Sequence, residues 1–186
     1  TGGLPIADGS GNGKTFDTLI TNGYEPTGGL FSGGFRFNPY TALLNGDVAY
    51  GQTSIGINGL SQVCFEAWCI IDPDFTGQPV TIVGTDTVSN DNSCLVGTSS
   101  YDTGTGDAPL AITNGLTVHR DWDATNEQNA SDPYFEFTIA TNGIVGTSTT
   151  IQSRKVPTSR YLHVLGEYDA GSETMWLYVN GDLHAT

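Results

Sequence analysis

A tryptophan among acidic and amide side chains is the part of this sequence best suited to bind a sugar. Trp122 lies in an acidic loop with Asp121, Asp123 and Asn126, and a second acidic loop carries Tyr101. An aromatic ring stacks on the apolar face of a pyranose, while carboxylates and amides bind its hydroxyl groups. We therefore expect these five residues to form a ligand site. The competing interpretation is that Trp122 folds back as a loop anchor and the acids are solvated.

A glycine-rich loop near the start of the chain suggests a metal site. Asp8, Ser10 and Asn12 place oxygen-bearing side chains at alternate positions before Gly13, which matches the first half of a calcium loop. The position at which a bidentate Glu would complete that loop is Leu19. The same residue types are common in turns, so an ordinary turn and a structural calcium ion completed by distant carboxylates both stay open.

Two glutamates in predicted strands are candidates for catalysis. Hydrolysis of a glycosidic bond needs two placed carboxylates. Glu66 and Glu136 have no acidic residue two positions away on either side. We therefore expect no enzymatic activity, and we expect Glu66 to be a strand-face carboxylate that is hydrogen-bonded to neighbours or open to a concave surface.

The three cysteines do not suggest a metal site or a thiol nucleophile. Cys64 and Cys69 are five residues apart on one predicted strand, so they lie on opposite faces and cannot pair there. Either one of them pairs with Cys94, or all three are small buried apolar residues. We favour the second interpretation.

Composition and charge bound the class of protein. The 186 residues predict one domain, residues 1–186, with an insertion or a pair of short strands at 39–60. Twenty-five Gly, with abundant Thr, Asn and Asp, favour strands and turns over helices. A net charge of −14 argues against nucleic acid as a partner, and Arg154, Lys155 and Arg160 are expected to form a solvated basic loop. No apolar run is long enough to predict membrane insertion.

The alternation of apolar and polar residues predicts an all-β fold with many short strands. The apolar run at 63–71 should be a central strand with 78–84 beside it. The other strands are expected at 15–21, 31–37, 94–99, 110–120, 134–140 and 144–151.

The last twenty-six residues give the clearest structural prediction. Leu162 and Val164 alternate with polar and aromatic residues, and Met175, Leu177 and Val179 do the same further on. Two such runs joined by a short polar loop predict a β-hairpin. The following Asn-Gly pair at 180–181 suits a type I′ turn, so a third strand should begin at residue 182.

Several of these motifs together resemble a known family. In order along the chain, the sequence is similar to laminin G-like domains of the concanavalin A-like lectin and glucanase superfamily at residues 8–13, 31–37, 65–68, 161–169 and 175–181. The resemblance implies a two-sheet antiparallel jelly-roll sandwich, often with a structural calcium. Family members continue beyond the Asn-Gly turn, so we expect the last strands to be supplied by a continuation of the chain or by another chain.

The resemblance and the residues together favour three functions. The first is a non-catalytic structural or adhesive module of an extracellular or virion-surface assembly, packed against other chains and in contact with glycans. The second is a carbohydrate-binding, lectin-like module of a larger secreted protein. The third, a glycoside hydrolase or polysaccharide lyase, has the least support because no paired carboxylates are evident.

Overall fold

The computed structural model describes the C-terminal part of the chain almost continuously and the rest in segments. The described residues are 11, 13, 18–20, 24–30, 32–35, 50–52, 60–71, 73, 92–101, 109–119, 122–123, 128–129, 132–140 and 148–186. By its contacts the chain divides into two compact units, Thr1–Ile57 and Asn58–Thr186.

The described strands of the first unit form two short antiparallel pairs. Strand β1 (Thr18–Ile20) pairs with β4 (Tyr50–Gln52), and β2 (Tyr24–Gly29) pairs with β3 (Ser32–Phe35). Strands β1 and β3 lie inside the predicted strands at 15–21 and 31–37. Strand β4 is a short strand within the range 39–60.

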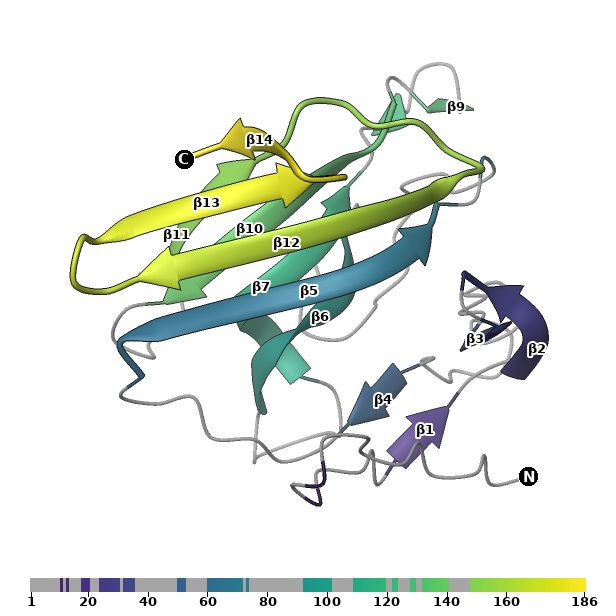
Figure 1. The fold of residues 1–186 in the computed structure, drawn as a ribbon, viewed down its shortest axis with the longest axis horizontal. Coiled ribbons are helices and arrows are strands. Elements are labelled where there is room, and N and C mark those ends of the chain that lie inside the picture. The colour runs from purple at the N-terminus through teal and green to yellow at the C-terminus, as the bar shows by residue number, and fades with distance from the viewer. Residues whose placement is uncertain are drawn as a thin grey trace. The chain divides into compact units, whose positions relative to one another are not determined.

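The second unit contains two four-stranded antiparallel sheets (Figure 1). One has the order β14-β13-β12-β5, formed by Asp182–Ala185, Thr174–Val179, Tyr161–Asp169 and Gln62–Ile70. The other has the order β11-β10-β7-β6, formed by Ser148–Gln152, Tyr134–Ala140, Pro109–His119 and Asn92–Tyr101. A two-residue pair, β8 (Trp122–Asp123) with β9 (Gln128–Asn129), completes the described strands. The predicted all-β class with antiparallel sheets is confirmed.

The two sheets contact each other through the alternate residues of their strands. The Phe65 ring of β5 lies 6.2 Å, centroid to centroid, from the Phe137 ring of β10. A Cβ placed on Gly166 of β12 would lie 2.6 Å from ring atoms of Phe137, so this glycine makes room for the ring. The buried apolar side chains gather between the sheets, which gives the unit a sandwich-like core: Phe65, Leu116, Val118, Phe135, Phe137, Ile139, Leu162, Val164, Met175, Leu177 and Val179.

The predicted C-terminal hairpin is confirmed. Leu162 and Val164 are buried, and His163 between them is not. Asn180 and Gly181 have φ angles of 53° and 85°, as a type I′ turn requires, and β14 begins at Asp182. The sequence also predicts a strand at 78–84 beside β5, but that range lies outside the described residues.

Candidate functional site

The outward face of the β14-β13-β12-β5 sheet exposes a group of large side chains. On β5 the even-numbered residues point away from the other sheet, because Phe65 and its alternate neighbours point toward it. The Trp68 residue is 49% exposed, and Ile70 and Tyr161 are also exposed. Antiparallel pairing places Tyr161 opposite Ile70 and His163 opposite Trp68. An aromatic and apolar patch therefore spans β5 and β12.

At the centre of this face, the side chain of His163 contacts both Trp68 and Glu66. The rings of Trp68 and His163 are 4.6 Å apart, centroid to centroid, and tilted by 35°. Nε2 of His163 lies at hydrogen-bond distance, 2.7 Å, from Oε1 of Glu66. The expectation that Glu66 is a hydrogen-bonded strand-face carboxylate is confirmed. We name Glu66, Trp68 and His163 the aromatic cluster.

The hairpin fixes the position of the aromatic cluster. The backbone N–H of His163 donates to Oδ1 of Asn180, and the backbone N–H of Asn180 donates to the carbonyl of His163. Asn180 therefore sets the turn after β13 and also extends the pairing of β12 with β13 by one position. This double contact holds the backbone of β12 at His163.

The same face carries a cysteine and a second carboxylate. Glu167 pairs with Cys64 in the β12–β5 register, diagonally beside Glu66. Burial, and then the charges of Glu167 and Glu66, raise the pKa of the Cys64 thiol. Both Cys64 and Cys69 are free thiols on opposite faces of β5. The expectation that all three cysteines are buried is wrong for Cys64, which is exposed because it lies on the outward face of the sheet.

Cys69 lies on the opposite face of β5 and is partly buried. Burial alone raises the pKa of its thiol to about 12. A thiol with such a pKa is almost entirely protonated at neutral pH and is a poor nucleophile. The side chain of Cys94 lies outside the part of the chain whose side chains the structure describes.

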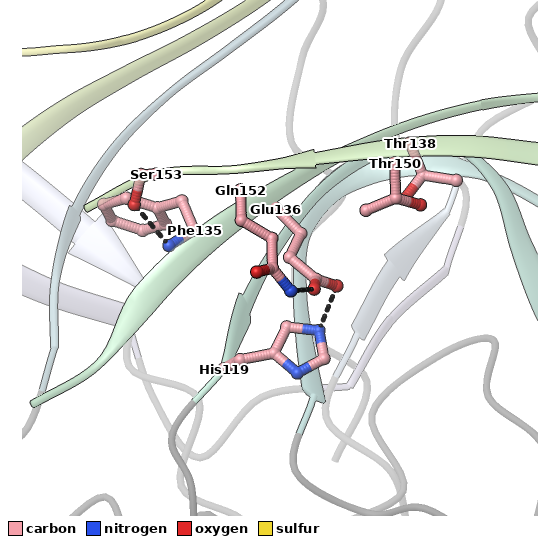
Figure 2. A network of polar contacts seen from close by, with 7 residues as sticks. All are labelled: His119, Phe135, Glu136, Thr138, Thr150, Gln152 and Ser153. Atoms are coloured by element: carbon pink, nitrogen blue, oxygen red, sulfur yellow. Dashed lines mark hydrogen bonds and ion pairs between the residues drawn. The ribbon is translucent and has the colours of Figure 1, made fainter. Parts of the chain in front are cut away.

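A second cluster occupies the outward face of the other sheet (Figure 2). Glu136 of β10 lies between β7 and β11. Its Oε2 is 2.6 Å from Nε2 of His119, an ion-pair distance. Its Oε1 accepts a 2.5 Å hydrogen bond from Nε2 of Gln152. Beside it, the hydroxyl groups of Thr138 and Thr150 form a hydrogen bond of 2.9 Å. We name Glu136, His119 and Gln152 the polar cluster.

The surroundings of Glu136 hold it in the charged form. Burial of this carboxyl opposes its ionisation, but the contact with His119 and the hydrogen bond from Gln152 outweigh the effect of burial and lower its pKa. The His119 ring stacks on Tyr134 with centroids 5.3 Å apart, and Nζ of Lys155 lies 4.2 Å from the centre of the Tyr134 ring. The polar cluster is thus continuous with an aromatic ring and a cation.

The sequence-predicted sites lie mostly outside the described residues. The backbones of Trp122 and Asp123 form β8 and that of Tyr101 ends β6, but their side chains are not described. Asp121 and Asn126 lie outside the described residues, as do Asp8, Ser10 and Asn12. Gly11 and Gly13 have φ angles of 79° and 69°, which fits a tight loop there. Among the described residues no group of three His, Cys, Asp or Glu side chains is arranged to hold a metal ion.

Sequence reasoning missed both clusters. Glu66 and Glu136 were recognised, but their histidine partners were not. The available signal was the strand alternation, which places Glu66 and Trp68 on one face of one strand and His163 on one face of another. The register that brings the two strands together is not readable from spacing.

Within the described residues no helix is long and apolar enough to cross a membrane.

Comparison with known proteins does not place the chain in a family. No protein-family model, curated protein or solved structure matches this chain.

Proposed function

We propose that this chain is a non-catalytic adhesive module of an extracellular or virion-surface assembly, and that it binds glycans through the aromatic cluster. The observation that carries the proposal is the half-exposed ring of Trp68, held against His163 beside the carboxylate of Glu66. A fixed, exposed ring with polar groups at its edge has the two features that sugar recognition needs.

The cluster provides both kinds of contact within one small area. The Trp68 ring offers an apolar surface for the C–H groups of a pyranose. The Glu66 side chain is 54% exposed, so the carboxylate can accept hydrogen bonds from sugar hydroxyls in addition to its bond with His163. Because His163 contacts both residues, little side-chain freedom has to be lost on binding.

The positions of the glutamates support a non-catalytic role. Glu66 and Glu136 lie on outward faces of different sheets, so they cannot flank one glycosidic bond. Glu66 and Glu167 do share a face, but more than half of the Glu66 side chain is exposed, whereas the general acid of a glycosidase lies in an apolar pocket.

The laminin G-like family remains the identity that we propose for the fold. The two antiparallel sheets and the hairpin of β12 and β13 are consistent with a concanavalin A-like jelly roll. The proposal includes a structural calcium near Asp8, Ser10 and Asn12. Adding a chelator would then lower the melting temperature of the protein, and an unchanged melting temperature would contradict the calcium.

A glycan array tests the adhesive function. The wild-type chain should bind at least one class of glycan, and Trp68→Ala should weaken that binding at least tenfold, since it removes the apolar ring on which the sugar stacks. Leu60→Ala is a matched control, because Leu60 is exposed but precedes β5. An array without binding, or equal binding by Trp68→Ala and wild type, would overturn the proposal.

A second candidate, docking against another copy of the chain, is favoured by Ile70 and Leu183. Both aliphatic side chains are exposed on the β14-β13-β12-β5 sheet, and exposed apolar patches mark interaction surfaces. If this is the function, sedimentation should show concentration-dependent association that Ile70→Lys abolishes. A monomer at all concentrations would rule it out.

A further inference from the structure

An open depression lies beside the polar cluster, where β11 ends and the chain turns back past the start of β10. It is lined by Tyr134, Gln152, Ser153, Arg154 and Lys155. All five belong to the second unit of the chain, and none belongs to the aromatic cluster on the other sheet. The depression is therefore separate from the surface to which we assign adhesion.

Hydrogen bonds to β10 and its preceding residues fix the backbone of residues 153–156, the segment that forms one wall of the depression. Ser153 accepts a 2.9 Å hydrogen bond at Oγ from the backbone N–H of Phe135 and donates from Oγ to the carbonyl of Arg154 at 2.7 Å. The backbone N–H groups of Ser153 and Val156 donate to the carbonyls of Phe135 and Pro133. Ser153 and Val156 are buried, so the exposed side chains of residues 154 and 155 between them are presented from a fixed backbone.

Two cations line this depression in a strongly acidic chain. The protein has only six Lys and Arg residues against a net charge of −14, and two of the six are here. Lys155 is placed by its contact with the Tyr134 ring. Arg154 is placed by a 3.4 Å hydrogen bond from Nη2 to the carbonyl of Leu183. A guanidinium has five N–H donors, so this bond uses only a small part of its capacity.

The positive field of Arg154 also affects its neighbour His184. Burial of the His184 imidazole, and then the charge of Arg154, lower the pKa of that ring. His184 is therefore mainly neutral at neutral pH. The cationic side chains at the depression are therefore Arg154 and Lys155, and not His184.

We propose that this depression binds the single carboxylate of an acidic sugar at the end of a glycan. Arg154 and Lys155 bind the carboxylate. Oε1 of Gln152 accepts a hydrogen bond from a sugar hydroxyl, since Nε2 of Gln152 already donates a hydrogen bond to Glu136. The net charge selects one carboxylate over a polyanion. A single carboxylate in the depression is attracted by the two cations a few ångströms away. A long polyanion would also lie within the screening length, about 8 Å at physiological salt, of the acidic residues around the depression and would be repelled by them.

Titration calorimetry with matched sugars tests this site. A trisaccharide of lactose ending in sialic acid and a disaccharide ending in glucuronate serve as carboxylate probes. Lactose is the neutral control and heparin is the polyanion. At least one carboxylate probe should bind, at least tenfold more tightly than lactose, with affinity that falls as salt is raised. No binding of either carboxylate probe, equal binding of lactose, or tighter binding of heparin would overturn the proposal.

Two variants locate the binding. Arg154→Gln combined with Lys155→Gln should weaken the binding of the carboxylate probe at least tenfold. Arg160→Gln should change it less than twofold, because Arg160 belongs to the same basic stretch but does not line the depression. Equal loss in the Arg160→Gln variant would show an effect of net charge alone and would contradict the site. Urea unfolding of each variant identifies any loss that comes from misfolding, and Arg154→Lys, which keeps the charge, should restore part of the binding.

Trp68→Ala separates this site from the adhesive surface. Binding of the carboxylate probe should be unchanged in that variant. If Trp68→Ala abolishes it, the sugar binds at the aromatic cluster and the depression is not the site. If the glycan array shows no dependence on Trp68 while the carboxylate probe still depends on Arg154 and Lys155, the adhesive proposal fails and this one stands.

Discussion

Each of the two sheets carries one Glu–His pair on its outward face, and the two pairs differ in almost every other respect. The Glu136 side chain is only 15% exposed and contacts both His119 and Gln152, while more than half of the Glu66 side chain is exposed and its carboxylate contacts His163. One histidine stacks on a tyrosine that lies beneath a lysine; the other is tilted against a half-exposed tryptophan.

The difference shows that the same two residue types serve different purposes according to burial. A largely buried carboxylate with two partners is part of the framework, because removing it leaves the largely buried His119 without that contact. An exposed carboxylate beside an open ring contributes little to stability and is available to a ligand. We therefore assign stability to the polar cluster and recognition to the aromatic cluster.

The largest loss of stability should come from disturbing the core between the two sheets. Gly166→Ala places a Cβ 2.6 Å from atoms of the buried Phe137 ring, so the ring or the strands must move. We expect a loss of about 3 kcal/mol in the free energy of unfolding, measured with urea. Gly171→Ala is the control: its nearest neighbour is a carboxylate oxygen of Asp169, in a turn, at 3.1 Å. Equal effects of the two substitutions would show that the sheets are not packed as described.

A smaller effect should separate the two glutamates. Glu136→Ala leaves His119 and Gln152 without their shared partner, and we expect it to lower the free energy of unfolding by about 2 kcal/mol. Glu66→Ala removes one exposed hydrogen bond and should cost less than about 1 kcal/mol. Urea unfolding of both variants measures the difference. If Glu66→Ala proves the more destabilising, our division between framework and recognition is wrong.

The smallest effect is in the pH dependence of stability. The pKa of Glu136 is lowered below its ordinary value of 4.5, so its contribution to stability is present above that value and is lost as the pH falls through the lowered pKa. Glu136→Gln should therefore flatten the loss of stability below about pH 4.5. Some loss should remain, because the N–H of Gly171 and the amide of Gln62 also lower the pKa of Asp169.

The urea midpoint, measured between pH 7 and pH 3, records this change, since that range spans the ordinary carboxyl pKa of about 4. Identical curves for Glu136→Gln and wild type would contradict the charged state that we assign to Glu136.

The sequence predicted the parts of the fold that depend on neighbouring residues. The alternation through Leu162 and Val164 and the Asn-Gly pair at 180–181 are local signals, and the structure confirms the strands and the turn that they predict. Local signals of this kind cannot predict the aromatic cluster or the polar cluster. Glu66 and His163 are 97 positions apart, and only the register of β5 with β12 brings them together.

The error over Cys64 has a similar origin. An apolar run predicts a strand buried on both faces, but the face of β5 that carries Cys64 and Trp68 points away from the other sheet. Hydrophobicity of a strand does not tell which of its faces is covered. The ligand residues predicted around Trp122, and the calcium residues Asp8, Ser10 and Asn12, remain predictions.

The two hydrogen bonds between Asn180 and His163 have a consequence for changing this protein by design. They connect the turn after β13 to the strand that carries the aromatic cluster, so the length and sequence of β14 can be altered independently of the cluster only while Asn180 is kept. A peptide insertion placed after Gly181 preserves this connection, whereas one placed before Asn180 removes it. The boundary between what can be exchanged and what must be kept thus lies at one turn residue.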